Sequence, residues 1–419
     1  MTRLTVLVLV ALLAMACAPT AGSSAAGASA PSRPAVSQAA PQPATGGSAG
    51  PEFQQLVERA RASDGRLRSS MASYTPEYVR AIEGRFQERF GIPLHLENEP
   101  GHASREIPQK ILQAQRAGKG VVDWVETGNP SNFAPLMEAG ALQVPPWDAL
   151  SEEWPQIADL RQLYPNAPGG PNGTTLQDYC MLQTQALWTL VYNTRNVRAS
   201  DVQNLVLDDL LTDKWRGRLA FDADGLGFKE LPFHKDWSLE RVQAYAHNLG
   251  ANGLKLISGG SNGVGQAIIQ GEGDIGFMSS DIALDLISTG APLALAWPDV
   301  IPTNDLGTCI PAITANNPDL AALFFAWRDL DGQWLRAELG GGGARPFYAP
   351  EADRYPLAKL VKETGVTNDR LARPASLDDY RLIDKQRAAA VEAQKAGIQS
   401  GTRVPYPWAC QRQHPACVQ

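Results

Sequence analysis

The sequence has no excess of positive charge and no basic run, which argues against nucleic acid as a partner. Its 37 Lys and Arg residues are outnumbered by 44 Asp and Glu residues, giving a formal net charge of −7 and a pI near 5.4. Proteins that bind nucleic acid through its phosphates usually carry a basic face. We therefore expect a globular protein with no nucleic-acid partner.

The apolar run at the start of the chain is too short to span a membrane. It extends from Leu4 to Ala14, whereas a helix needs roughly 20 apolar residues to cross a bilayer. Ala14 and Ala16 place small residues at both positions that a signal peptidase requires, which predicts a signal peptide over residues 1–16. Cleavage there makes Cys17 the new N-terminus.

The segment around the cleavage site, "LLAMAC", resembles a lipoprotein box, although Met15 departs from the usual pattern, as does Ala14, where Leu is commoner. We expect Cys17 to be acylated; the alternative is an ordinary secreted protein that begins with cysteine. The rest of residues 17–50 is almost entirely Ala, Pro, Ser, Gly, Thr and Gln, which predicts a flexible linker. The expected location is extracytoplasmic, lipid-anchored to the cell membrane, in the periplasm or at the cell surface.

Cysteine is scarce, with five residues in the chain, of which four remain once the acylated cysteine is set aside. An even number in an oxidising compartment allows two disulfides. Cys410 and Cys417 are close enough in the chain to staple the C-terminal tail, which would leave Cys180 with Cys309. A histidine lies between the last two cysteines, so a zinc site is the alternative, but the spacing matches no standard zinc pattern.

After residue 50, short strand-like runs alternate with amphipathic helical patterns, which predicts an α/β fold with largely parallel sheets. One helical pattern begins at Pro76, repeats its apolar residues at Ile82 and Phe86, and ends at Gly91. In open α/β sheets, the loops after the strands form the ligand crevice. The segments "SYTPE", "NEPGHAS" and "ETGNPSN" are therefore expected to share one rim.

Six further segments follow one another in a recognisable order: "ERFGIPLHLE", "VDWVETGNPSNFAPLMEAGAL", "LWTLVYNT", "LLTDKWRGRLAF", "GQAIIQGEGDIGF" and "NNPDLAALFFAW". In order and spacing, the chain from about Phe53 to Gly397 resembles the extracellular solute-binding proteins of ABC importers, especially the ferric-ion-binding type. The resemblance implies the type II periplasmic-binding-protein fold. This is a two-lobed α/β clamp, or Venus flytrap, in which two hinge-crossing strands join the lobes and ligand binds between them.

The resemblance also implies where the chain crosses between lobes. One crossing is expected near Leu187–Tyr192 and the return near Leu306–Ile313, which would bring Cys180 and Cys309 close to adjacent strands. A final helix over Leu377–Ala396 is expected to pack on the second lobe. The implied division is 51–186 and 306–345 for the first lobe, 187–305 for the second lobe, and 346–419 for a C-terminal segment with a Cys-stapled tail.

Ferric-ion members of this family have a pair of adjacent tyrosines in the second lobe. The matching positions here are about Ser280, Asp281 and Ile282, and the family's first-lobe glutamate and histidine fall near Gly128 and Thr75. Hydroxyls with one carboxylate are a poor replacement for phenolates, which are hard anionic ligands. We therefore do not expect iron bound in the family's usual manner, and we predict no metal site and no cofactor.

Ligand contacts are expected instead from polar residues that follow the strands. Asp281 can accept from an ammonium or hydroxyl group, while Ser279 and Ser280, beside a helix N-terminus, can donate to an anion. Capping of the helix is the alternative role for Ser280 or Asp281. The predicted ligand contacts are Tyr74, Thr75, Thr127, Gly128, Asn129, Asp222, Ser261, Asn262, Gly263, Ser279, Ser280 and Asp281.

Several polar and aromatic residues also have a simple structural interpretation. Thr75 can cap the first helical pattern, and residues 261–263 can form a plain glycine-rich turn. His102, in a loop, is more typical of a solvated histidine than of a ligand contact. Trp188 and Tyr192 either wall the cleft or, as is commoner for aromatic residues, pack in the core.

The charges expected at the cleft do not decide between a cationic and an anionic ligand. Acidic groups outnumber basic ones, which favours a cation such as a polyamine or a metal chelate. Serine, asparagine and glycine at helix starts favour phosphate, phosphonate or a sugar phosphate. The acidic groups are Asp222, Asp224, Asp281 and Glu126, and the basic groups are Arg105 and Lys229.

The glycine-rich segment "GGSNG" also allows an enzymatic hypothesis. Gly259, Ser261 and Gly263 fit the G-x-S-x-G pattern of serine hydrolases, between a strand-like and a helix-like run. Such an enzyme needs a histidine further along the chain, and the only one is His414 in the tail. The pattern therefore supports a hydrolase only weakly.

We interpret the protein as a binding module with no catalysis of its own. The expected partners are a small-molecule or ion ligand, an ABC permease and, through the lipid anchor, the membrane. The protein is expected to act as a monomer. A ligand-sensing input domain of a sensor kinase is an alternative use of the same clamp.

Overall fold

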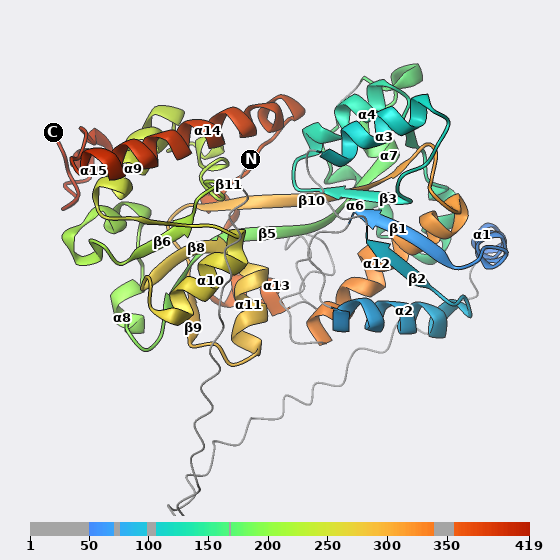
Figure 1. Cartoon of the computed structure of the whole chain (residues 1–419), viewed down its shortest axis with the longest axis horizontal. Coiled ribbons are helices and arrows are strands. Elements are labelled where there is room, and N and C mark those ends of the chain that lie inside the picture. Colours follow the sequence, from blue (N-terminus) through green and yellow to red (C-terminus); the bar gives the residue numbers. More distant parts are fainter. Residues whose placement is uncertain (1–49, 71–75, 99–105, 167–168, 339–355) are drawn as a thin grey trace, which may run out of the picture. The chain divides into compact units, whose positions relative to one another are not determined.

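The computed structural model describes residues 50–70, 76–98, 106–166, 169–338 and 356–419. The described strands form one sheet of eleven strands, in the order β2-β1-β3-β10-β5-β8-β6-β7, with β4, β9 and β11 paired beside this path. Two long strands in the middle of the order, β5 (Cys180–Asn193) and β10 (Ile301–Pro311), lie between two halves of the molecule and join them (Figure 1). No helix in the described part of the chain is both long and apolar enough to cross a membrane.

The first half contains three parallel strands that alternate with two helices. The helix predicted from Pro76 is present, and its residues Ile82, Phe86 and Phe90 are buried. Because every helix returns the chain in the same direction, the carboxyl ends of the strands lie at one edge of the sheet. The elements are β1 (Arg66–Ser70), α2 (Pro76–Phe90), β2 (His95–Asn98), α3 (Glu106–Arg116) and β3 (Trp124–Thr127).

The central helix of the first half is α12 (Pro318–Glu338). Its residues 320–330 are all buried, and residues 320–327 are apolar on every face, as expected of a buried helix. Phe324 and Trp327 contact the ring of Phe86 in α2, with centroids 5.5 and 5.2 Å away. The other elements of this half are α1 (Pro51–Arg61), η1 (Pro130–Asn132), α4 (Ala134–Glu138), β4 (Leu142–Gln143), α5 (Trp147–Glu153), α6 (Ile157–Gln162), η2 (Pro171–Gly173) and α7 (Leu176–Tyr179).

The second half repeats the arrangement of parallel strands and helices. Phe221 of β6 and Phe277 of β8 lie in register and form part of its core, with ring centroids 5.8 Å apart. Its main elements are β6 (Leu219–Asp222), α9 (Leu239–Ala251), β7 (Lys255–Ile257), α10 (Gly260–Gln270), β8 (Ile275–Ser279), α11 (Ser280–Ser288) and β9 (Leu293–Ala296). The shorter elements are α8 (Ala199–Val202), η3 (Leu207–Leu211), η4 (Asp213–Trp215) and η5 (Leu231–Phe233).

β5 and β10 belong to both halves. They pair antiparallel from Cys180 opposite Cys309 to Leu187 opposite Thr303, and the remainder of β5 pairs with β8 and β9. Residues 307–309 of β10 also pair with β3 of the first half. The strands shared by the halves therefore begin earlier in the chain than the predicted crossings, at Cys180 and Ile301.

Two disulfides stabilise this arrangement. Cys180 and Cys309 face each other across β5 and β10 with Cα atoms 4.5 Å apart, and Cys410 joins Cys417 in the tail. Both disulfides join the cysteines that the sequence predicted to pair. The alternative zinc site is wrong, because cysteines joined in a disulfide have no thiolate to give a metal.

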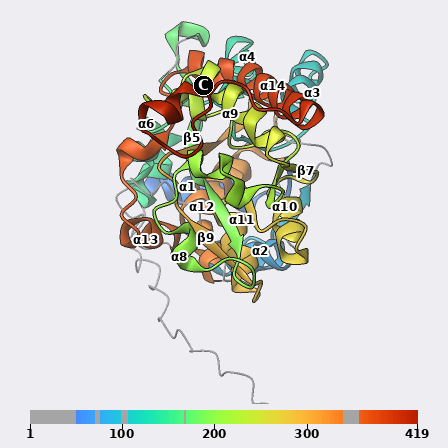
Figure 2. The same cartoon turned by 90° about the vertical axis from the view of Figure 1, so that its left-hand side faces the viewer.

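The final helix, α14 (Leu377–Ser400), begins at the predicted residue and packs against α9 in the second half (Figure 2). The two helices approach closely through glycines, because a Cβ atom at Gly397 would lie 1.9 Å from the carbonyl oxygen of His247. The other end of α14 contacts the first half, where Leu377 joins the hydrophobic core and Tyr380 donates a hydrogen bond to Asp305 of β10 at 2.9 Å. The helix therefore bridges both halves.

The C-terminal tail packs on the second half, consistent with a structural role. The hydroxyl of Tyr406 donates to Asp208 at 2.7 Å and accepts from Arg241 at 3.1 Å, and all three residues are buried. His414 pairs with Asp209 at 2.8 Å. The remaining C-terminal elements are α13 (Pro356–Glu363), η7 (Asn368–Arg370), β11 (Leu371–Ala372) and α15 (Pro407–Gln411).

Substitution of Gly397 with Ala should destabilise the protein, because the added methyl group would force α14 away from α9. Overpacking of this kind costs about 1–3 kcal/mol. The matched control is Gly84→Ala in α2, where a Cβ atom meets nothing within 4 Å, so that variant should be neutral or slightly more stable. Urea denaturation of both variants measures the difference, and equal midpoints would contradict the close packing.

Candidate functional site

The loop after β3 supplies the predicted contacts of the first half. The hydroxyl of Thr127 accepts from the backbone N–H of Asn129 and from the amide of Asn132, both at 3.1 Å. The side-chain oxygen of Asn129 accepts from the backbone N–H of Ser131 at 3.0 Å. These bonds hold the segment that includes Gly128 in one conformation, so part of its polarity is used by the loop itself.

In the second half, β8 runs directly into α11 at the Ser279-Ser280-Asp281 segment. Ser279 is the N-cap residue, its hydroxyl donates to the carboxylate of Asp281, and both side chains are buried. Ser280 is fully buried, and its hydroxyl accepts from the backbone N–H of Leu187 at 3.3 Å. The hydroxyl of Ser280 therefore contacts β5 as an acceptor.

The first turn of α10 lies against the end of β8. The Ser261 hydroxyl accepts from the backbone N–H of Ser279 at 3.0 Å. Gly259 and Gly260 precede it with φ of +98° and +63°, values that favour glycine. A Cβ atom at Gly263 would lie 2.0 Å from the carbonyl oxygen of Ser258. Backbone geometry thus explains these three glycines. Of the side chains in this turn, that of Asn262 is the exposed one.

The serine hydrolase hypothesis does not fit this geometry. The Ser261 hydroxyl contacts β8, and no histidine in the described part of the chain forms a hydrogen bond with it. His414, the only histidine further along the chain, pairs with Asp209 in the tail. Without a base beside the hydroxyl, the serine is not activated as a nucleophile.

Asp222, the last residue of β6, is the most unusual side chain of the candidate site. It is only 2% exposed, and its Oδ1 atom accepts from the backbone N–H of Asp224 at 2.9 Å. Its Oδ2 atom is buried without a hydrogen-bond partner among the described residues. Burial raises the pKa of Asp222, although nearby backbone N–H groups, including those of Gly260 and Leu226, lower it in part.

Two charges that the sequence assigned to the cleft belong to other contacts. Glu126 accepts from Arg328 of α12 at 2.7 Å, and both side chains are buried. Lys229 forms a buried ion pair with the neighbouring Glu230. Of the expected cleft charges that the structure describes, Asp222, Asp224 and Asp281 remain, and all three are acidic.

The sequence analysis missed the buried polar network around Arg328. This guanidinium also donates to Asp329 at 2.7 Å and to Thr308 at 3.0 Å. A signal was present, because the charged pair interrupts the apolar run of α12, and a charge in such a position needs a buried partner. Which residues would supply that partner depended on how α12 packs against β3 and β10.

Other predicted positions divide between the core and the undescribed residues. Trp188 and Tyr192 are buried in the core of the second half, which confirms the packing interpretation. Tyr74, Thr75, His102 and Arg105 lie outside the described residues. Within the described residues, no group of three or more His, Cys, Asp or Glu side chains is placed to hold a metal ion.

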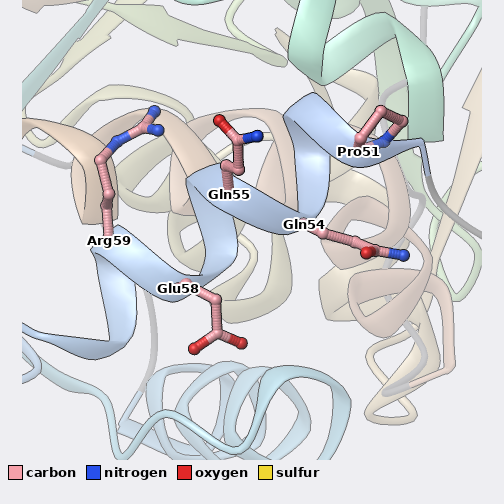
Figure 3. Close-up of a pocket in the computed structure, with 5 residues that line it drawn as sticks. All are labelled: Pro51, Gln54, Gln55, Glu58 and Arg59. Atoms are coloured by element: carbon pink, nitrogen blue, oxygen red, sulfur yellow. The ribbon is translucent and has the colours of Figure 1, made fainter.

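A shallow hollow of about 570 Å³ lies on the surface of α1, away from all of these residues. Figure 3 shows that its lining side chains fan out along a single helix and do not converge on a common point. None of them was predicted as a ligand contact. They are Pro51, Gln54, Gln55, Glu58 and Arg59.

No family model matches this sequence, and no curated protein matches it. Among solved structures, the substrate-binding protein of an ABC transporter from Agrobacterium tumefaciens is 18% identical, with a TM-score of 0.56 over 78% of this chain and 94% of that chain. The periplasmic binding protein AfuA from Actinobacillus pleuropneumoniae, with fructose 6-phosphate bound, is 16% identical, with a TM-score of 0.56 over 79% and 99%. Iron-bound HitA from Pseudomonas aeruginosa is 17% identical, with a TM-score of 0.51 over 78% and 98%.

These likenesses cover most of both chains in every pair. At this level of identity they establish the fold, and they confirm that it is the two-lobed fold of type II periplasmic binding proteins. The predicted α/β clamp with two strands crossing between its halves is therefore correct. The ligand of each of these proteins says nothing by itself about the ligand of this chain.

Asp329 should make stability depend on pH. Burial raises its pKa to about 6, Arg328 opposes the shift, and the charge of Glu126 adds to it. Because folding raises this pKa, the contribution to stability is complete below the unfolded value near ~4 and is lost as pH rises through about 6. The stability advantage of wild type over Asp329→Asn should fall by about 2 kcal/mol between pH 4 and pH 7.

Urea denaturation of both proteins at the two pH values measures this change. Asp159→Asn, which removes an exposed carboxylate from α6, controls for the loss of one negative charge. An advantage that is the same at both pH values would show that Asp329 does not titrate in this range.

Proposed function

We propose that this protein is an extracytoplasmic substrate-binding lipoprotein that captures a small solute between its two halves and delivers it to an ABC import permease. The observation that carries the proposal is the architecture: parallel strands of both halves end in polar loops, and β5 and β10 join the halves. Folds of this kind bind ligands beyond the carboxyl ends of their strands. The similar structures include a substrate-binding protein of an ABC transporter and a periplasmic binding protein.

Capture requires the two halves to move relative to each other. A ligand that contacts both halves in a closed form, and only one in an open form, shifts the equilibrium by the difference in its affinities. The proposed lobes are 51–186 with 306–345, and 187–305. The permease then recognises the closed form, and the protein itself has no catalytic step.

The proposed ligand contacts come from the ends of strands in both halves. Thr127 ends β3 and is followed by Gly128 and Asn129, while Asp222 ends β6. Ser261, Asn262 and Gly263 begin α10, and Ser279 with Asp281 begins α11. Tyr74 and Thr75 stay in the proposal because they follow β1 in the sequence, although they lie outside the described residues. Ser280 also stays in the proposal, although it is fully buried and its hydroxyl contacts β5.

Asp281→Asn should weaken ligand binding without unfolding the protein, because the amide keeps the shape of the side chain and removes its charge. The measurement is a thermal-shift screen against ferric citrate, putrescine, phosphonates, sugar phosphates and sugars. At a hundredfold excess over its dissociation constant, a true ligand stabilises the protein by about 2.7 kcal/mol. The control is Glu240→Gln, which changes an exposed carboxylate on α9.

One responding class of compound, with a reduced shift in Asp281→Asn and a normal shift in Glu240→Gln, supports the proposal. An unchanged shift in Asp281→Asn would remove this residue from the binding site. A protein stabilised by none of these compounds would count against the capture of a small solute.

The lipid anchor makes a separate prediction. Cys17→Ala should release the protein from the membrane into the soluble extracytoplasmic fraction, because an acyl chain can no longer attach to the thiol. Fractionation of cells expressing each form, with labelled palmitate as a tracer, measures the effect. A variant that stays in the membrane fraction would show that Cys17 is not the anchor.

A further inference from the structure

One oxygen of the Asp222 carboxylate lacks the hydrogen-bond partner that its burial demands. One of its oxygens is taken by the backbone of Asp224, and the other is buried without a hydrogen bond among the described residues. Buried polar groups are nearly always paired, and an exception calls for an explanation such as a bound ligand or ion. Among the described residues, no Lys or Arg forms an ion pair with Asp222, so none of them neutralises this carboxylate.

The position of this carboxylate changes the character of the helix beside it. The first turn of α10 would by itself attract an anion, because the N–H groups at the start of a helix have no acceptor within it and the helix dipole is positive there. Asp222 already places a negative charge close to the backbone N–H of Gly260, the first residue of α10. A phosphate group entering this position would meet a carboxylate where the helix would otherwise bind it.

The neighbouring groups strengthen the negative charge. The carboxylate of Asp224 lies close enough to Asp222 to raise its pKa. β6 and β8 are adjacent parallel strands with Phe221 opposite Phe277, so Asp222 and the Ser279–Asp281 segment end at the same edge of the sheet. Asp281 therefore adds a second buried carboxylate at this edge, whereas Lys229 is neutralised by Glu230.

We infer that this end of the proposed binding site takes an organic cation, whose ammonium group donates to Asp222, and that it rejects phosphate and phosphate esters. The inference rests on the proposed function, because it concerns the ligand of the same site. Of the two ligand classes that the sequence left open, the placement of Asp222 at the start of α10 selects the cation. Asp222 is then a residue that determines specificity by charge.

The test compares wild type with Asp222→Asn, which keeps the shape of the side chain and removes its charge. Isothermal titration uses putrescine and spermidine as cationic probes, and inorganic phosphate and fructose 6-phosphate as anionic probes. Asp236→Asn, on the same half, is the matched control, because that carboxylate is 54% exposed. We expect an amine to bind wild type and Asp236→Asn, and to lose at least tenfold in affinity in Asp222→Asn.

A second measurement needs no ligand. The unliganded Asp222→Asn protein should melt at a higher temperature than wild type, because the variant no longer buries an unpaired carboxylate. Since burial raises the pKa of Asp222, the difference should grow as pH rises from 4 to 7. A variant that melts at or below the temperature of wild type at every pH would overturn the inference, because it would show that Asp222 is already satisfied.

The outcomes separate the inference from the proposed function. A phosphate compound that binds wild type, with equal or higher affinity for Asp222→Asn, would overturn the inference and leave the binding function in place. An amine whose affinity is the same in both proteins would also overturn it. If none of the four probes binds, while the screen described above finds a neutral ligand, the cationic class is wrong. Failure of every compound would defeat the proposed function, and the inference with it.

Discussion

The antiparallel pairing of β5 with β10 is the contact on which the rest of the structure depends. Every residue of β5 is buried, and the ladder between the strands is secured at one end by the Cys180–Cys309 disulfide. Gly307 of β10 lies so close to the ring of Tyr164 that a Cβ atom there would be 2.1 Å away. Because both strands continue into the sheets of both halves, their register determines where the strand ends of each half lie.

α14 provides a further connection between the halves, and Asp305 of β10 is where it meets the crossing strands. The Asp305 carboxylate accepts from Gln185 of β5 at 2.7 Å, from Arg373 at 2.7 Å and from Tyr380 of α14 at 2.9 Å. The far end of α14 is held against α9 by the close approach at Gly397. Through these contacts, α14 links the crossing strands to the second half.

The candidate functional site has a cost in stability as well as a proposed function. Asp222 buries a carboxylate at the end of β6, where an apolar residue would give a more stable protein without ligand. Charges in such positions are typical of binding sites, in which the ligand supplies the missing interaction. In contrast, the Arg328 network pairs its charged groups within the chain, where it joins α12 to β3 and β10.

Local patterns in the sequence determined the α/β class, the helix from Pro76, the helix from Leu377 and the loops that follow the strands. These features depend on periodicity and capping, which act over a few residues. The direction of each polar side chain was decided only by tertiary structure. Ser280 and Asp281 are neighbours in the chain, yet Ser280 contacts β5 while Asp281 pairs with Ser279. Glu126 turned to Arg328, and Asp222 came to lie at the start of α10, because long-range strand pairing sets which face each residue presents.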